Sequence, residues 1–129
     1  MAQHISAFAL VVPDYDAALA FYVDTLGFDL IEDTPQSESK RWVLVAPKGS
    51  QTRILLAKAD GAKQRDAIGN QTGGRVGFFL HTDSFEADFQ RLRSAGVHFE
   101  ENPRHEPYGS VAVFQDPFGN RWDLLQLNS

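Results

Sequence analysis

The architecture of this chain follows from a run near its N-terminus, Phe8-Ala9-Leu10-Val11-Val12-Pro13-Asp14. Five apolar residues that stop at a proline and an aspartate predict a short strand buried on both faces. Asp14 can then cap a helix, which Gly27 ends. One face of that helix is marked by four apolar residues at helical spacing, Leu19, Tyr22, Val23 and Leu26.

The same order of elements occurs twice. Strands are expected at 28–32, 41–46 and 52–57 after the first helix, with a turn at 47–50. The second half begins with an apolar strand at 76–80 and a helix for which Asp83 and Glu86 offer a capping box. Gly96 ends this helix, and strands at 97–100, 110–115 and 121–127 follow, the last two joined by a turn at 116–120.

The two halves are in register, because Asp83 follows Asp14 by 69 residues and Gly96 follows Gly27 by the same 69. This spacing indicates an internal duplication of one strand, helix and three-strand unit. We therefore predict an α+β fold of two βαβββ modules, which form a curved eight-stranded mixed sheet around a pocket with the helices outside. The single domain 1–129 then divides into module one at about 1–58, a linker at about 59–74 and module two at about 75–129.

The linker is the one long polar stretch, and it is rich in glycine. Either it is a lid over the pocket, or it is a solvated connector, which long loops more often are.

Composition excludes several classes of protein. Hydrophobic residues make up 43% and charged residues 22% of the chain, as in ordinary globular domains. The net charge of −5 argues against nucleic-acid or membrane-surface partners. The absence of cysteine excludes disulfides and thiolate metal sites, and no apolar run has the about 20 residues of a membrane span. A cytoplasmic protein is the expectation.

Two motifs resemble those of a known family, the vicinal-oxygen-chelate superfamily, which includes glyoxalase I, extradiol dioxygenases and bleomycin-resistance proteins. The first runs from Val12-Pro13-Asp14-Tyr15 through Phe21-Tyr22 to Leu26-Gly27-Phe28. The second runs from Pro107-Tyr108-Gly109 through the turn Asp116-Pro117-Phe118-Gly119-Asn120 to Asp123-Leu124. The resemblance spans nearly the whole chain and implies paired βαβββ units.

The metal enzymes of this family resemble one another in carrying one ligand on the first and last strand of each unit. Those positions fall here on Ala7, Leu55, Gly77 and Asp123. Only Asp123 can coordinate a metal ion, and a lone carboxylate does not hold one against water. We therefore expect no metal and no cofactor.

Asp123 is the candidate catalytic residue, because an apolar pocket would raise its pKa and suit it to a general base. The alternative is an aspartate that is simply bonded to a neighbour. His81 and Tyr108 are candidate acids, and His105 lies in a polar loop that resembles the mouth of the family's site. The expected pocket lining is formed by Ala7, Leu55, Gly77, Phe79 and Phe114.

A basic rim is a further hypothesis. Arg53, Arg75 and Arg121 each lie two residues before a pocket position, and alternation sets them on the same face as that position. Such a rim would favour an anionic ligand. Solvated strand ends are the favoured alternative, since strand ends are commonly charged.

Three functions follow, in this order. The first is metal-independent binding or sequestration of a small molecule by a homodimer, as the resemblance to bleomycin-resistance proteins implies. The second is a metal-independent lyase or isomerase with Asp123 as base. The third is a metal-dependent enzyme of the glyoxalase type.

Overall fold

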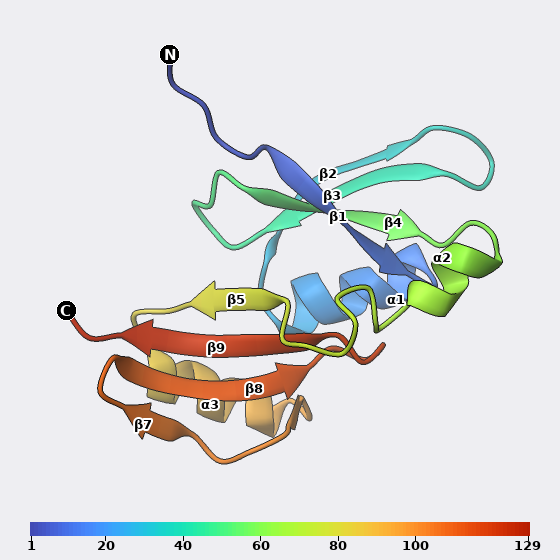
Figure 1. The fold of residues 1–129 in the computed structure, drawn as a ribbon. Coiled ribbons are helices and arrows are strands. Elements are labelled where there is room, and N and C mark those ends of the chain that lie inside the picture. The colour runs from blue at the N-terminus through green and yellow to red at the C-terminus, as the bar shows by residue number, and fades with distance from the viewer. The chain divides into compact units, whose positions relative to one another are not determined.

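A computed structural model describes all residues from Met1 to Ser129. The chain divides into two compact units, at Met1–Ile68 and Gly69–Ser129. Each unit combines one mixed β-sheet with a helical segment (Figure 1). None of the helices combines the length and the hydrophobicity that a membrane span requires.

The first unit is built on a four-stranded sheet in the order β1-β4-β3-β2. The strands are β1 (Ala7–Val12), β2 (Asp29–Pro35), β3 (Arg41–Ala46) and β4 (Arg53–Lys58). Strands β1 and β4 are parallel, and the other neighbours are antiparallel. The helical segments are α1 (Tyr15–Leu19), its π-helical continuation η1 (Ala20–Thr25) and α2 (Ala62–Ala67). In the core of this unit, α1 packs against β4.

The second unit has a five-stranded sheet in the order β5-β9-β8-β6, with β7 also paired to β8. Its strands are β5 (Phe78–His81), β6 (His98–Phe99), β7 (Arg104–Glu106), β8 (Gly109–Gln115) and β9 (Arg121–Leu127). Its helix is α3 (Phe85–Ser94), which packs against β9. Stacked rings fill the space under the sheet: Trp122 lies 4.9 Å from Phe78 and 5.8 Å from Phe114, measured between ring centroids.

The predicted α+β class and the two modules of the family are confirmed. In both units a parallel strand pair contains the first and last strands, and in both a glycine ends the long helical segment. Gly27 and Gly96 have φ of +91° and +90°, the left-handed conformation that glycine adopts without strain.

The capping prediction is right for one helix and wrong for the other. Asp14 caps α1, because its Oδ2 accepts a hydrogen bond of 2.8 Å from the backbone N–H of Ala17. Ser84, not Asp83, is the N-cap residue of α3, and its side chain makes no capping hydrogen bond. The N–H of Phe85 instead donates to Oε1 of Gln126, which β9 supplies. A distant side chain thus replaces the predicted capping box.

Two elements were not predicted. The polar stretch at 59–74 contains α2, and the loop expected around His105 contains β7, which gives the second sheet its fifth strand.

Candidate functional site

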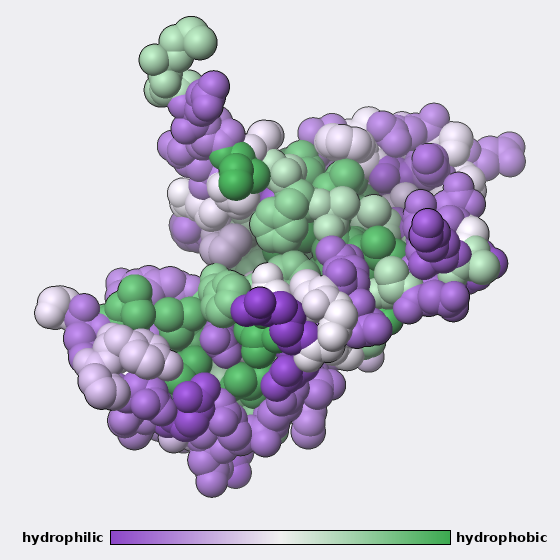
Figure 2. Space-filling view, viewed as in Figure 1, coloured by the Kyte–Doolittle hydropathy of each residue, from purple (hydrophilic) through white to green (hydrophobic).

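Each sheet has a face turned away from its helix, here called its open face. On the first sheet, Leu10, Val12, Ile54 and Leu56 are buried towards the helix, so the alternate residues lie on the open face. These alternate residues are Ala7, Ala9 and Val11 on β1, Arg53, Leu55 and Ala57 on β4, and Trp42, Leu44 and Ala46 on β3. Apolar atoms gather over β1 and β4 in the space-filling view (Figure 2).

The open face of the second sheet is centred on β9. Trp122 and Leu124 are buried towards α3, which leaves Asp123 and Leu125 on the open face. Phe79 pairs with Asp123 across the parallel strands and is 62% exposed. Apolar atoms over β5 and β9 are interrupted by hydrophilic ones in the same view (Figure 2). An aromatic ring and a carboxyl group therefore stand side by side on this face.

The carboxyl of Asp123 is half-buried and makes no hydrogen bond or ion pair. Burial raises its pKa, against the nearby charge of Arg104, which lowers it. Glu101 adds to the rise, while Arg121 opposes it. A carboxyl that is partly desolvated and unpartnered can act as a proton acceptor, or can bind a hydroxyl or ammonium group.

The neighbouring cations are already engaged. Arg121 donates to both carboxylate oxygens of Glu100, over 2.8 Å from Nε and 2.7 Å from Nη2. Arg104 donates from Nε to Glu101 at 3.0 Å and from Nη1 to Glu106 at 3.2 Å. Neither guanidinium is bonded to Asp123, so this carboxyl is available to a ligand.

Phe114 does not line the open face as predicted. It is fully buried and packs between Phe99 and Trp122 on the helix side of the sheet. The strand pairing requires this, since Phe114 lies opposite Trp122 and shares its face.

Position 77 has no room for a ligating side chain. A Cβ added at Gly77 would collide with the side chain of Thr72. Ala7 and Leu55 lie on the open face of the first sheet but carry no donor atom. Nowhere do three or more His, Asp or Glu side chains lie close enough together to hold a metal ion. The side chains at the family's ligand positions therefore do not fit a metal centre.

The other candidates are spread around Asp123. His81 pairs with Leu125, which places it on the same open face, where it is exposed. Tyr108 is 52% exposed in the turn between β7 and β8. His105 pairs with Ser110, out of phase with the Asp123 face, and its Nδ1 lies 2.9 Å from the Ser110 hydroxyl oxygen.

The three arginines of the predicted rim differ in their surroundings. Arg121 holds Glu100, as described, and Arg75 is exposed with its Nε donating to the carbonyl of Val76. Arg53 is different, because its Nε is buried and has no hydrogen-bond partner.

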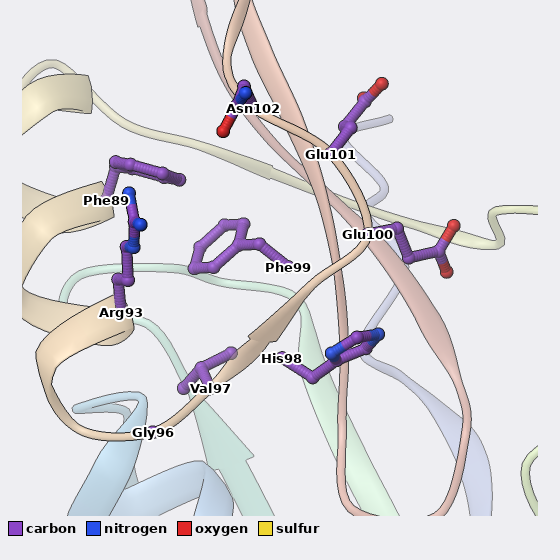
Figure 3. Close-up of a pocket in the computed structure, with 9 residues that line it drawn as sticks. All are labelled: Phe89, Arg93, Gly96, Val97, His98, Phe99, Glu100, Glu101 and Asn102. Carbon is purple, nitrogen blue, oxygen red and sulfur yellow. The ribbon is translucent and has the colours of Figure 1, made fainter.

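Of the residues that line the two clefts described next, sequence reasoning predicted only Leu55. One of about 540 Å³ lies between the C-terminal end of α3 and β6 in the second unit. Phe99 points into it towards Phe89 and Arg93, whereas His98 and Glu100 point away (Figure 3). The other, of about 250 Å³, opens in the first unit beside Trp42, Leu55 and Ala57, with Lys40 and Lys58 in its lining. The second cleft had one signal in the sequence. Trp42 lies two residues before Leu44 on a predicted strand, so alternation sets both side chains on one face of the sheet.

Comparison with known proteins places the fold and the family. A family model described as Glyoxalase/Bleomycin resistance protein/Dioxygenase superfamily matches residues 4–124. A protein of Shewanella frigidimarina (strain NCIMB 400), described as uncharacterized, is 55% identical over 130 residues, which cover 99% of this chain and 96% of that protein.

Two solved structures are similar over nearly their whole length. The crystal structure of UcmS2 has a TM-score of 0.83 and 35% sequence identity, covering 97% of this chain and 98% of that chain. The structure of TnmS3, an antibiotic binding protein from Streptomyces sp. CB03234, has a TM-score of 0.79 and 36% identity, covering 98% of each chain. The paired βαβββ units and these matches show that this chain belongs to the Glyoxalase/Bleomycin resistance protein/Dioxygenase superfamily.

Proposed function

We propose that this protein binds and sequesters a small organic molecule on the open face of its sheet structure, without a metal ion. The observation that carries the proposal is the half-buried Asp123, which has no partner and stands beside the exposed ring of Phe79. Small-molecule sites in proteins combine apolar walls with a few polar groups that fix the orientation of the ligand. Similarity to TnmS3, which is described as an antibiotic binding protein, supports the same function.

The chemistry of this face indicates the kind of ligand. Phe79 and Leu125 offer an apolar surface on which a flat ring can stack. Asp123 can accept a hydrogen bond from a hydroxyl group or bind an amine, and the loss of water around it strengthens that contact. A planar molecule with a cationic or hydroxyl substituent is the expected class for this surface.

The test uses 9-aminoacridine, a planar cation, and metal-free bleomycin as probes, with chelator-stripped protein and titration calorimetry. Asp123→Asn and Phe79→Ala are each expected to weaken binding of a probe on the order of tenfold, since a charge-assisted hydrogen bond or a stacked ring is lost. Glu86→Gln on α3 and His105→Ala, on the other side of the sheet, are the matched controls. Undiminished binding in both Asp123→Asn and Phe79→Ala would contradict the proposal.

Catalysis is the second candidate, favoured by the raised pKa of Asp123. In this reading Asp123 removes a proton from the bound molecule as general base of a lyase or isomerase, with His81 or Tyr108 as acid. Asp123→Asn separates the two functions, because it would abolish turnover of a substrate that still binds. If Asp123→Asn lowers the affinity for the bound molecule and the unaltered protein does not turn that molecule over, the result favours sequestration.

Metal independence has its own test. The thermal midpoint of stripped protein is measured with and without Zn²⁺, Ni²⁺, Mn²⁺ and Fe²⁺, because an ion that binds only the folded state raises it by mass action. No saturable rise is expected. A specific rise of several degrees with one ion would favour the metal-dependent, glyoxalase-type enzyme instead.

We also propose that the protein is a homodimer, on the basis of its family. Large apolar side chains that remain exposed on the second unit support this: Phe79, Tyr108 and Leu127 are each more than half exposed. Sedimentation equilibrium at micromolar concentration would give a mass of twice 14.4 kDa for the dimer. A single 14.4 kDa species would exclude it.

A further inference from the structure

Arg53 occupies an unusual place on the open face of the first sheet. Its partner on β1 is Ala7, and the register of β3 and β4 sets Ala46 beside it on the other side. Both neighbours are alanines, so their side chains offer no hydrogen-bond acceptor to the guanidinium. Its β4 neighbours on this face, Leu55 and Ala57, are apolar.

The guanidinium of Arg53 lacks an acceptor. Its Nε is buried and makes no hydrogen bond, and Arg53 forms no ion pair. Arg41, Arg104 and Arg121 each hold at least one carboxylate instead. Buried donors in folded proteins are almost always paired, and leaving one unpaired is unfavourable, more so in a charged group. Arg53 is therefore a donor whose acceptor is missing from its own unit.

The surface next to Arg53 is suited to a flat apolar body. Leu55 follows Arg53 on the same face at about 7 Å along the strand. Beyond it the cleft beside Trp42 opens, lined also by Lys40 and Lys58, which form no ion pair. The same lining also includes Asp60, so cations outnumber the anion around the cleft but do not surround it. A molecule with an acid group at Arg53 would thus have its ring over the apolar Leu55.

We propose that the open face of the first sheet binds an aromatic carboxylate, with the carboxylate accepting hydrogen bonds from the Arg53 guanidinium and the ring lying against Leu55 and Trp42. The planar guanidinium matches a carboxylate in a two-pronged contact that lysine cannot reproduce. This inference rests on the proposed ligand-binding function and names a ligand class for the open face of the first unit.

The experiment compares 2-naphthoate with 2-naphthamide, which has the same ring and shape but no charge. Binding is followed in ¹⁵N-labelled protein by the backbone amides and by the Nε–H resonance of Arg53, which reports the proposed contact directly. The variants are Arg53→Gln and Arg53→Lys. Arg65→Gln is the matched control, because Arg65 lies on α2 of the same unit, is exposed, and lies outside the lining of the cleft. The amide spectrum of each variant verifies that it folds.

The expected result is a shift of the Arg53 Nε–H resonance and of β4 amides with 2-naphthoate, and binding of 2-naphthamide weaker on the order of tenfold. Both Arg53 variants should lose a similar factor, Arg53→Lys included, while Arg65→Gln binds as the unaltered protein does. Equal binding of the two probes, or an unmoved Arg53 resonance at millimolar 2-naphthoate, would overturn the inference. If 9-aminoacridine still binds at Phe79 and Asp123 in that case, the proposed function stands without it.

Discussion

Arg121 donates two hydrogen bonds, of 2.8 and 2.7 Å, to the carboxylate of Glu100 and none to Asp123, which lies two residues along the same strand. The pairing lowers the pKa of Glu100, chiefly through the hydrogen bonds from Arg121. It also directs the guanidinium away from Asp123 and leaves that carboxyl without a partner. One ion pair thereby stabilises the sheet and keeps the neighbouring group open to a ligand.

Arg121→Met removes the ion pair with Glu100 and should lower the free energy of unfolding at neutral pH. The loss should be only about 1 kcal/mol, because the pair is partly exposed and screened by solvent. A carboxylate with a lowered pKa contributes stability above its unfolded pKa, near 4.5, and loses it as the pH falls through the folded value. The difference from the unaltered protein should therefore shrink in acid. Urea unfolding at several pH values measures it, with Arg65→Met on α2 as control. A deficit that stays constant in acid would argue against the ion pair as its cause.

Asp123→Asn should have the opposite effect on stability. The raised pKa of Asp123 means that folding favours its protonated form, so its contribution is most favourable below the unfolded pKa of 3.8 and is lost as the pH rises. The uncharged variant should melt higher at neutral pH, by on the order of 1–3 °C, and match the unaltered protein in acid. Calorimetric melting points over a pH series give the result, and Glu38→Gln, in the exposed β2–β3 turn, serves as control. A lower melting point for Asp123→Asn at neutral pH would refute the argument.

The N-termini of α1 and α3 allow two matched substitutions to be compared. Asp14→Ala removes the side-chain cap of Ala17 and should cost about 1 kcal/mol. Asp83→Ala removes no cap, because Gln126 holds the first free N–H of α3, so its cost should stay within about 0.5 kcal/mol. Urea unfolding at neutral pH compares them. Equal losses would mean that Asp83 caps α3 after all.

The turn at 116–120 should be the most sensitive loop. Asp116 is 4% exposed and accepts hydrogen bonds from the N–H groups of Phe118 and Asn120 and from the Asn120 side chain. Asp116→Ala leaves all three donors unpaired and should cost about 3 kcal/mol. Asn120→Ala keeps both backbone bonds and should cost less. Asn128→Ala, at an exposed bond to Pro107, is the control, and chemical unfolding gives the order.

Much of the fold could be predicted because the turns that bound its strands are encoded by residues next to those strands in the sequence. Strands β3 and β9 begin and end where the sequence indicated, since turns with proline and glycine bound them. Asp123 was placed in the pocket by the family's ligand position, and in the structure it alternates with Trp122, which is a core residue. These features depend on residues close together in the chain.

The errors occur where distant residues determine the outcome. All four residues from Val111 to Phe114 are buried, so β8 shows no alternation from which the face of Phe114 could be read. Gln126 reaches a helix 41 residues away, and Thr72 fills the space at Gly77. The orphaned Nε of Arg53 likewise depends on three strands that meet only in the folded chain.

Strand β2 has an implication for the behaviour of the protein in solution. It is an outer strand, every one of its residues is exposed, and Leu30 and Ile31 are its apolar members. Such a strand invites edge-to-edge aggregation, but Asp29 and Glu32 flank the apolar pair with negative charge. A bulge between Leu30 and Glu32 also interrupts the regular ladder, and Pro35 ends the strand. This protection is largely electrostatic, so dissolved salt screens it. The protein should stay dispersed at low ionic strength and begin to self-associate through β2 as the salt concentration rises.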